Sequence, residues 1–325
     1  MTKTEYYKRL ARIFWSYRRK RTRLSYNPIR LWIEATSWCN LACVMCPNKE
    51  LPKEQKGYME FDLFRKIADE AAGFVYEIHL LHRGESLLHP RFFDMVRHAR
   101  DKGIVTKFHT NGTLLDEDKA RALIASGLDQ FSFSFDGYDA ASYEAIRVKG
   151  DFEKTAGNIV RFLEIKKALG ARKPATYLEL IDMPERYRSQ DKDAKAKFLA
   201  RFEGLPLDGL EIKEFHNWAG NLGAVPCGRK YSPSSFLWSA LIIFWNGDVL
   251  PCTQDFTGLL KLDNVREKSL AEIWNGPALI GLRERLLRKD YAGLNPCAGC
   301  DRLWRKQFLG IPTEYAWKAL FKKMP

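Results

Sequence analysis

The sequence lacks an apolar run long enough to cross a membrane. The longest nearly apolar stretch, Phe236–Trp245, is only about half of the roughly 20 residues that a membrane-spanning helix needs, and it predicts a buried strand. The N-terminus is basic, but no apolar secretion segment follows it. We therefore expect a cytoplasmic protein.

The middle of the chain also lacks an excess of positive charge, although the whole sequence carries a formal charge of +13. Residues 1–30 contribute +9 and residues 302–325 contribute +5, so residues 31–301 carry a net charge of −1. Nucleic-acid binding requires a basic groove or stripe. The charge distribution therefore argues against a nucleic-acid partner and places the basic character at the two termini.

Disulfide bonds cannot account for all of the cysteines, because seven is an odd number. A reducing cytosol would leave these residues as thiols for metal binding or catalysis. Their grouping indicates two separate sites. The first set comprises Cys39, Cys43 and Cys46, and the second comprises Cys227, Cys252, Cys297 and Cys300.

Short β-type runs alternate with longer helix-type stretches between residues 31 and 215. Such alternation is typical of βα units, in which helices return the chain for parallel strand pairing. We expect six such units in an incomplete parallel barrel, with the loops after the strands gathered at one mouth. The predicted strands are Leu31–Ala35, Tyr76–Arg83, Ile104–Thr110, Gln130–Phe135, Ala175–Asp182 and Leu210–Phe215. The predicted helices are Phe61–Ala72, Arg91–Lys102, Asp116–Ser126 and Phe152–Leu169.

The first cysteine set follows the first predicted strand as Cys39-Asn-Leu-Ala-Cys43-Val-Met-Cys46. This CxxxCxxC loop lets three thiolates converge on one polynuclear metal centre and leaves one iron open. Its spacing and place resemble the radical S-adenosylmethionine (SAM) superfamily. The resemblance implies an α/β fold with a partial (β/α)6 TIM-like barrel, whose [4Fe-4S] cluster binds SAM and cleaves it reductively to a 5′-deoxyadenosyl radical. Buried thiols or a zinc site are the alternatives, but no fourth zinc ligand is nearby in the sequence.

Further loops after predicted strands resemble segments that line the SAM site of this family. Gly84 and Glu85 match a Gly-Gly-Glu segment around the SAM amino group, whereas Arg83 departs from it. By the same resemblance, Ser134 and Asp136 are expected ribose contacts. Each of these residues alone also fits an ordinary turn or a solvated charge. The cofactor-binding residues that the resemblance implies are Cys39, Cys43, Cys46, Gly84, Glu85, Asn111, Ser134, Asp136 and Arg147.

The second cysteine set resembles the C-terminal extension called SPASM, or its shorter form called Twitch. After Cys227, a predicted hairpin with an Asn-Gly-Asp turn at 246–248 carries Cys252, and a Cys297-Ala-Gly-Cys300 pair closes the set. No cysteine follows Cys300. The resemblance therefore implies one auxiliary [4Fe-4S] cluster with four thiolate ligands, and a tetrathiolate zinc site is the alternative.

Twitch enzymes with a fully ligated cluster include an aminocyclitol dehydrogenase. This resemblance favours an oxidoreductase that removes two electrons from a small-molecule or lipid-linked substrate, with the auxiliary cluster as electron acceptor and a flavodoxin- or ferredoxin-type protein as external reductant. The general base stays open, because Thr253 stands where sulfatase maturases have Asp and Asp255 also fits a solvated carboxylate. Glu179 and Asp182 are candidate substrate contacts. A peptide-modifying maturase and a non-enzymatic zinc-binding adaptor are the alternative functions.

Both termini predict basic amphipathic helices, which either lie on an anionic membrane surface or pack on the barrel with a solvated basic face. We expect a basic segment at 1–30, a radical SAM barrel at 31–215, a SPASM/Twitch domain at 216–305 and a basic tail at 306–325. The apolar residues at helical spacing are Tyr6, Leu10, Ile13, Phe14 and Tyr17 near the start, and Tyr315, Trp317, Leu320 and Phe321 near the end.

Overall fold

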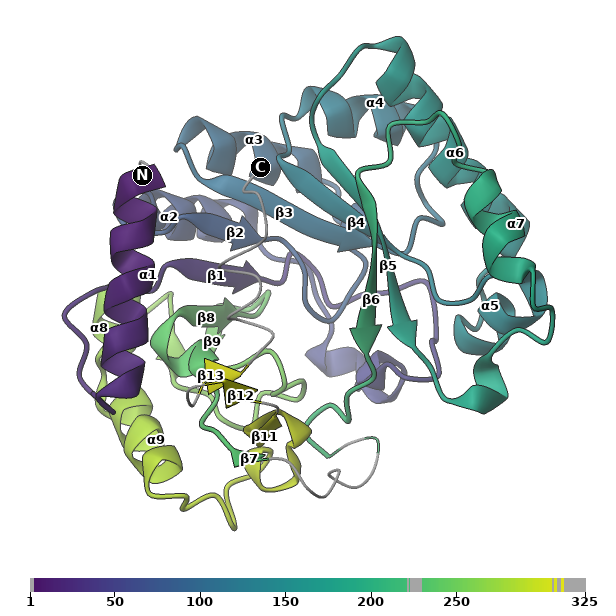
Figure 1. Ribbon diagram of the computed structural model, residues 1–325. Helices are drawn as coiled ribbons and strands as arrows, with labels where there is room; N and C mark the ends of the chain where they lie inside the picture. The colour runs from purple at the N-terminus through teal and green to yellow at the C-terminus, as the bar shows by residue number, and fades with distance from the viewer. Residues whose placement is uncertain (1–2, 221, 223–229, 306, 309–310, 313–325) are drawn as a thin grey trace. The chain divides into compact units, whose positions relative to one another are not determined.

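The structure is a computed structural model that describes residues 3–220, 222, 230–305, 307–308 and 311–312 (Figure 1). The chain divides into two compact units. Unit 1 comprises Met1–Ile33, Asp62–Ile78 and His216–Pro325, and unit 2 comprises Glu34–Phe61 and His79–Phe215. Within the described part of the chain, no helix is long and apolar enough to cross a membrane.

Unit 2 is built on four parallel strands in the order β3-β4-β5-β6. Alternate residues of these strands face opposite sides. On one side, Phe131 and Phe133 pack against Phe162 of helix α6 (Phe152–Ala168). On the other side lie polar residues such as His109 and Glu179. The strands are β3 (Val105–Thr110), β4 (Gln130–Ser134), β5 (Ala175–Asp182) and β6 (Gly209–Glu214).

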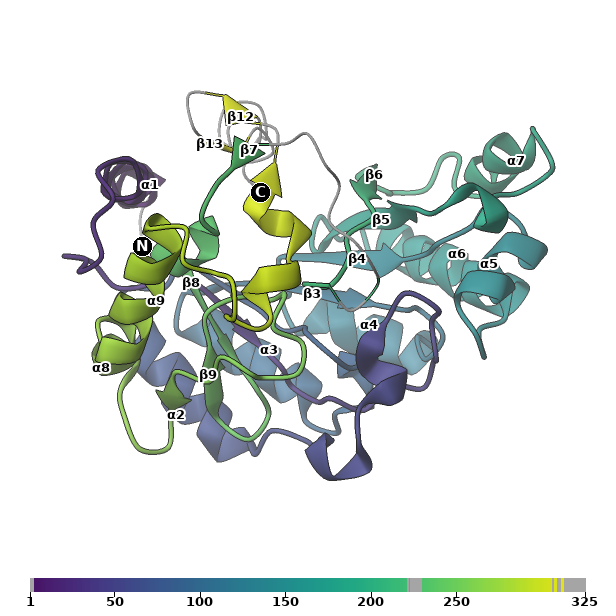
Figure 2. The same ribbon diagram turned by 90° about the horizontal axis from the view of Figure 1, so that it is seen from below.

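Aspartates begin the helices that connect these strands. Asp116, Asp139 and Asp151 each accept a hydrogen bond from a backbone N–H in the first turn of the helix that follows. Figures 1 and 2 show α4 and α6 side by side. The helices of unit 2 are α3 (Phe92–Asp101), α4 (Glu117–Ala125), α5 (Ala140–Ile146), α6 (Phe152–Ala168) and α7 (Ala194–Ala200), with short 3-10 turns η1 (Pro47–Glu50), η2 (Lys53–Gln55), η3 (Ser86–Leu88) and η4 (Glu185–Tyr187).

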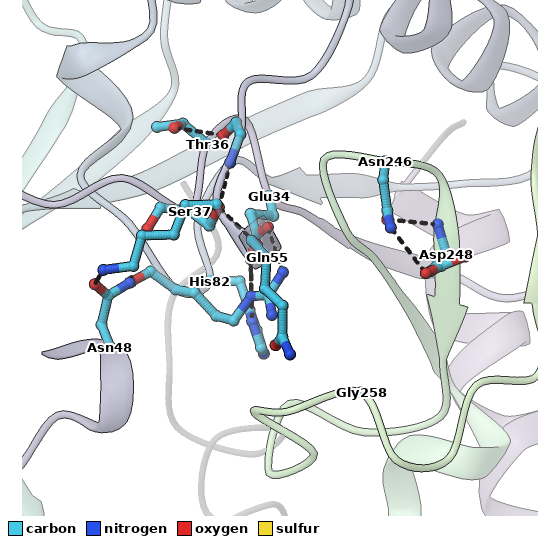
Figure 3. Close-up of polar contacts among 12 residues, drawn as sticks. Glu34, Thr36, Ser37, Asn48, Gln55, His82, Asn246, Asp248 and Gly258 are labelled. Carbon is cyan, nitrogen blue, oxygen red and sulfur yellow. Dashed lines mark hydrogen bonds and ion pairs between the residues drawn. The ribbon is translucent and has the colours of Figure 1, made fainter. Parts of the chain in front are cut away.

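Unit 1 contains a sheet in the order β10-β9-β8-β1-β2, in which β8 runs parallel to β1 and antiparallel to β9. The β8–β9 hairpin has the predicted turn, where Asn246 Nδ2 donates a hydrogen bond of 2.9 Å to Asp248 Oδ2 (Figure 3). The strands are β1 (Arg30–Ile33), β2 (Glu77–His79), β7 (Lys230–Tyr231), β8 (Ala240–Ile243), β9 (Asp248–Leu250), β10 (Asp263–Asn264), β11 (Trp304–Arg305), β12 (Gln307–Phe308) and β13 (Ile311–Pro312).

Three helices of unit 1, α1, α8 and α9, lie together in both ribbon views (Figures 1 and 2). The predicted N-terminal helix is present as α1, and its apolar side packs onto the unit: the Tyr6 ring lies 4.1 Å from the Tyr76 ring, and the Tyr17 ring lies 5.2 Å from the Trp238 ring. The helices are α1 (Lys3–Arg18), α2 (Phe61–Ala71), α8 (Leu270–Trp274) and α9 (Pro277–Leu287), with η5 (Ser235–Trp238), η6 (Cys297–Gly299) and η7 (Asp301–Leu303).

The predicted elements of the barrel recur with small shifts of their ends. All six predicted strands are found as β1 to β6, and Ala175–Asp182 has the predicted bounds. The second strand is shorter than predicted, because residues 80–83 leave the strand after His79. The prediction missed α7, and the predicted tail helix lies outside the described residues.

Candidate functional site

The first cysteine set lies on a loop of unit 2 that is hydrogen-bonded to the last residue of α5 and to Val148 just after it. Ala42 N donates to Val148 O at 3.0 Å, and Val44 N donates to Ile146 O at 2.9 Å. A third bond, from Cys46 N to Cys43 O, closes the loop on itself. These bonds bring Arg147 beside the three thiols.

The three thiols are mostly withdrawn from water. Burial raises the pKa of Cys39 to about 11 and that of Cys46 to about 12, and it also raises the pKa of Cys43. The thiols therefore keep their protons at neutral pH until a metal displaces them. Among the residues that the structure describes, no group of three His, Cys, Asp or Glu side chains is positioned to bind a single metal ion.

The guanidinium of Arg147 is a buried positive charge that faces these thiols. Its Nη2 donates to Asp136 Oδ2 at 2.6 Å, and Asp136 Oδ1 accepts from Ile181 N at 2.7 Å. Burial alone would lower the pKa of Arg147, but the attraction of Asp136 and Cys43 raises it, so the group stays charged. Its buried Nε has no hydrogen-bond partner among the described residues. A buried donor of this kind fits an anionic group, such as a thiolate-ligated cluster or the carboxylate of SAM.

Gly84 and Glu85 lie against the same loop. A Cβ at Gly84 would come within 2.3 Å of Thr36 O and 2.5 Å of Trp38 O, so only glycine allows this close approach. Glu85 is 3% exposed, and its carboxylate accepts hydrogen bonds from Leu87 N, Thr110 Oγ1 and, at 2.7 Å, Asn111 N. Burial raises the pKa of Glu85, and these hydrogen bonds oppose that shift.

The remaining expected SAM contacts lie at the ends of β3 and β4. The side chain of Asn111 donates from Nδ2 to Asn40 Oδ1 at 2.9 Å, which ties it to the cysteine loop. Ser134 is the last residue of β4 and pairs in register with Glu179 of β5. All nine expected cofactor residues thus belong to unit 2.

Sequence reasoning missed a buried ion pair just before the cysteine loop. Arg83 donates from Nε and Nη2 to the two carboxylate oxygens of Glu34, and His82 Nδ1 lies 3.7 Å from Glu34 Oε2 (Figure 3). Burial by itself would raise the pKa of Glu34, but the hydrogen bonds from Arg83 and the nearby His82 ring lower it below its ordinary value. An acidic residue at the end of the apolar run Leu-Trp-Ile was the available signal.

A polar network fixes the rest of the loop. Asn48 Nδ2 donates to Ser37 O at 2.8 Å, Lys56 Nζ donates to Asn48 Oδ1 at 3.1 Å, and Ser37 Oγ accepts from Gly57 N (Figure 3). Because these bonds join residues on both sides of the cysteines, the loop is held at both ends.

A second group, of which sequence reasoning identified only Glu179, lies on the polar side of β3, β5 and β6. His109 Nδ1 lies 3.5 Å from Glu179 Oε1, and Lys213 Nζ lies 2.5 Å from Glu179 Oε2. Burial lowers the pKa of His109, while the charge of Glu179 opposes this shift. The imidazole is therefore neutral at physiological pH, and among the described residues Glu179 is the one partner of its ring nitrogens. The alternation of side chains between the two faces of the strand at 105–110 was the available signal that His109 lies on the polar side.

The described part of the second cysteine set lines one cavity in unit 1. Cys252, Cys297 and Cys300 face a small cavity that is partly open to solvent and whose other lining residues are mostly apolar. Burial raises the pKa of Cys297, and Cys252 and Cys300 add to this effect, which places the three thiols close together. Such a group of neighbouring thiols fits an iron–sulfur cluster. Cys227 lies outside the described residues.

Asp255, considered above as a base, lies in the turn after Cys252 and is 1% exposed. Its carboxylate accepts hydrogen bonds from the backbone N–H groups of Gly258, Leu259 and Leu260 at 2.7 to 3.0 Å. The carboxylate of Asp255 therefore stabilises this turn.

Comparison with protein families decides the identity of this arrangement. The model of the radical SAM superfamily matches residues 33–169, and the model of the iron-sulfur cluster-binding SPASM domain matches residues 235–301. The chain belongs to the radical SAM superfamily. Membership implies a [4Fe-4S] cluster that binds SAM, and the SPASM domain implies auxiliary iron–sulfur binding. The first match contains the first cysteine set, and the second contains every member of the second set except Cys227.

Two curated relatives align with most of the radical SAM chain. This chain is 27% identical over 315 residues to the tungsten-containing aldehyde ferredoxin oxidoreductase cofactor-modifying protein of Pyrococcus furiosus. The alignment covers 83% of this chain and 86% of that protein. This chain is 26% identical over 317 residues to the PqqA peptide cyclase of Granulibacter bethesdensis, with 85% and 80% covered. These names describe relatives that modify a cofactor and a peptide.

A solved structure supports the fold. The crystal structure of BtrN in complex with AdoMet and 2-DOIA aligns with 84% of this chain and 92% of that chain, with a TM-score of 0.56 and 17% sequence identity. The expected fold class, an α/β partial (β/α)6 TIM-like barrel with a C-terminal SPASM-type extension, is confirmed.

Proposed function

We propose that this chain is a radical SAM oxidoreductase that removes two electrons from a small-molecule substrate. The observation that carries the proposal is the cavity lined by Cys252, Cys297 and Cys300, because a cluster that Cys227 completes as the fourth ligand would have no open iron and would store electrons instead of binding substrate. The lipid-linked substrate and the membrane contact that the basic termini suggest are not part of this proposal.

The first cysteine set is assigned to the SAM cluster. When bound, this cluster and SAM supply a 5′-deoxyadenosyl radical, which takes a hydrogen atom from the substrate. Arg147 holds a positive charge beside the thiolates, and Asp136 holds Arg147 in place. Gly84, Glu85, Asn111, Ser134 and Asp136 line the SAM site in this proposal, with Ser134 and Asp136 as the ribose contacts.

The second cysteine set, Cys227, Cys252, Cys297 and Cys300, is assigned to an auxiliary [4Fe-4S] cluster that accepts the second electron. Oxidation also requires that the substrate lose a proton. His109 is the base that we assign to this step, because it is neutral and lies with Glu179 on the polar side of the strands. Glu179 holds one ring nitrogen, so the other is the proton acceptor. Asp182 is paired with Arg188 and is 60% exposed, so we assign it no role.

A peptide-modifying function is the second candidate, because the PqqA peptide cyclase aligns over 85% of the chain. The similarity to a cofactor-modifying protein supports a small-molecule substrate over a peptide. The non-enzymatic zinc adaptor is set aside, because the chain belongs to a family of SAM-cleaving enzymes. The external reductant is proposed to be a flavodoxin- or ferredoxin-type protein, and the division into segments 1–30, 31–215, 216–305 and 306–325 stays a proposal.

The first test is anaerobic reconstitution with iron and sulfide counting, followed by an assay for 5′-deoxyadenosine after dithionite reduction. We expect about eight irons per chain, the sum of two [4Fe-4S] clusters. Replacing Cys39, Cys43 and Cys46 by Ala removes half the iron and all SAM cleavage. Replacing Cys252, Cys297 and Cys300 by Ala removes the other half and leaves SAM cleavage intact. Zinc in place of the second half would overturn the auxiliary electron acceptor.

The second test separates the two substrate classes. A cell extract is freed of protein, one portion is digested with a broad protease that is then removed by ultrafiltration, and both portions are added to the reduced enzyme. A small-molecule substrate stimulates 5′-deoxyadenosine formation equally in both portions. Loss of the stimulation after digestion would establish the peptide-modifying function instead.

A further inference from the structure

Helix α1 has an outward face that its packing does not use. The inward side is fixed to unit 1 by the ring contact of Tyr6 with Tyr76 and by a hydrogen bond from Arg9 to Phe74 O. The outward side combines exposed cations with large exposed aromatic side chains. Its exposed residues are Tyr7, Lys8, Arg12, Phe14, Trp15 and Arg18, followed directly by Arg19.

The end of α1 is connected to the auxiliary-cluster cavity by a short series of contacts. Tyr17 Oη donates to Pro233 O at 3.0 Å and lies 2.6 Å from Ser232 Oγ. Pro233 is joined by a peptide bond to Ser234, whose Oγ lies 3.8 Å from Cys252 Sγ. Two non-covalent contacts and one residue of backbone therefore separate Tyr17 from a proposed cluster ligand.

A parallel connection runs through the other side of the cavity. Ser232 N donates to Leu303 O at 2.8 Å, and Leu303 lines the cavity together with Cys300. Since Tyr17 contacts Ser232 as well, the last turn of α1 is coupled to two walls of the cavity.

We propose that the outward face of α1 is the docking surface for an acidic one-electron carrier protein of ferredoxin or flavodoxin type, which exchanges electrons with the auxiliary cluster through Tyr17 and Ser234. The proposal rests on the proposed function, because substrate oxidation leaves the auxiliary cluster with an extra electron that must leave before the next turnover. One electron passes from the reduced cluster to the oxidised carrier. No bond forms or breaks.

Charge complementarity supports an acidic protein as the occupant, because a basic patch steers acidic partners and raises the rate of encounter. The same face also fits an anionic lipid surface. The contacts from Tyr17 to the cavity favour the carrier, since coupling of the docking helix to the cluster serves electron transfer and has no use in lipid binding.

The test uses the reconstituted full-length chain in which Cys39, Cys43 and Cys46 are replaced by Ala, so that only the auxiliary cluster accepts electrons. Reduced plant-type [2Fe-2S] ferredoxin is mixed with this protein in a stopped-flow instrument at several salt concentrations, and ferredoxin binding is measured by calorimetry. The variant carries Lys8→Glu, Arg12→Glu and Arg19→Glu. The matched control carries Lys154→Glu, Arg161→Glu and Lys167→Glu on α6, which changes the net charge equally.

We expect the α1 variant to lower the second-order rate at low salt at least about tenfold and to weaken binding, and we expect high salt to remove the difference. The control keeps most of the rate. A second variant, Tyr17→Phe, keeps the ring against Trp238 but removes both hydroxyl contacts. It should slow electron transfer at saturating ferredoxin several-fold and leave the Kd unchanged.

Equal loss in the two charge-reversed variants, or an unchanged rate in Tyr17→Phe, would overturn the proposal. So would loss of sedimentation with phosphatidylserine vesicles in the α1 variant while its ferredoxin kinetics stay normal, because α1 would then be a lipid-binding surface. Iron counting keeps this outcome separate from the proposed function. A chain that holds no auxiliary iron contradicts the proposed function, whereas about four irons with α1-independent kinetics contradicts only the docking surface.

Discussion

Arg83 and Glu34 form a buried ion pair that joins the two chain segments on either side of the proposed SAM site. The guanidinium donates from Nε to Glu34 Oε2 and from Nη2 to Oε1 at 2.9 Å, and the two side chains are 3% and 0% exposed. Glu34 precedes the cysteine loop, and Arg83 precedes Gly84. The pair therefore joins the segment that leads into the cysteine loop to the segment that leads into Gly84.

Replacing Arg83 by Met should lower the free energy of unfolding by about 3–5 kcal/mol, because it leaves the Glu34 carboxylate buried without its main partner. Urea unfolding of the reconstituted protein, followed by circular dichroism, measures this change. The double variant Arg83→Met/Glu34→Leu should recover part of the loss, since no unpaired charge then remains.

Arg201 and Glu153 provide the control for this prediction, because they form a similar two-bond ion pair at the surface, with side chains 36% and 68% exposed. Arg201→Met should cost less than about 1 kcal/mol. Equal costs for Arg83→Met and Arg201→Met would show that burial of the Arg83 pair contributes nothing.

Gly84→Ala should destroy the SAM cluster without unfolding the protein. The added Cβ would overlap the carbonyl oxygens of Thr36 and Trp38, so the backbone that leads into the cysteine loop must move. Iron counting should show about four irons in place of eight, with no 5′-deoxyadenosine formed.

Gly157→Ala on α6 is the matched control, because nothing lies within 4 Å of a Cβ at that position. Alanine favours the helix, so this variant should be more stable by roughly 0.5–1 kcal/mol and should keep all its iron. Full iron and activity in Gly84→Ala would contradict the close packing of this glycine on the loop.

Arg147→Met should make the SAM cluster harder to reduce. The variant removes a buried positive charge beside the thiolates and leaves Asp136 negative, and both changes disfavour the added electron. We expect the midpoint potential to fall by roughly 60 mV or more, which is a tenfold change in a one-electron equilibrium. A redox titration followed by electron paramagnetic resonance, in protein with Cys252, Cys297 and Cys300 replaced by Ala, measures it. Arg201→Met in the same background should leave the potential unchanged, and an equal shift in both variants would exclude a local effect of Arg147.

Local sequence patterns predicted most of the barrel, because strand alternation and helix periodicity depend on neighbouring residues. The fifth strand has the predicted bounds. α7 was missed because its seven residues make only two turns, which is too short for a helical periodicity to stand out. Short helices depend more on tertiary packing than on propensity.

Partners far apart in the sequence were not predictable in the same way. Glu34 and Arg83 are 49 residues apart, and His109 meets Glu179 only because β3 and β5 both flank β4. The prediction identified Glu179 as an unusual acid in an apolar strand, but its pairing with His109 and Lys213 requires the order of strands. Likewise, the three hydrogen bonds that the Asp255 carboxylate accepts from backbone N–H groups depend on the conformation of one turn, which the sequence pattern did not predict.

His109 should titrate below the ordinary histidine range, and its neighbours should move that titration in opposite directions. Burial lowers the pKa, Glu179 opposes the shift and Lys213 adds to it. Glu179→Gln should therefore lower the pKa further, because it removes a charge that favours the imidazolium, and Lys213→Met should raise it. Nuclear magnetic resonance of protein with labelled histidine follows this, since the chain has six histidines and His109→Gln identifies the signal.

The same variants test the role of His109 as base once a substrate is found. Deprotonation needs the neutral imidazole, so product formation should rise with pH through the pKa of His109, and the acidic limb should move to lower pH in Glu179→Gln and to higher pH in Lys213→Met. His109→Gln should keep hydrogen transfer from the substrate to 5′-deoxyadenosine but lose at least about 100-fold in product formation. A pH profile that stays fixed in both neighbour variants would show that another group accepts the proton.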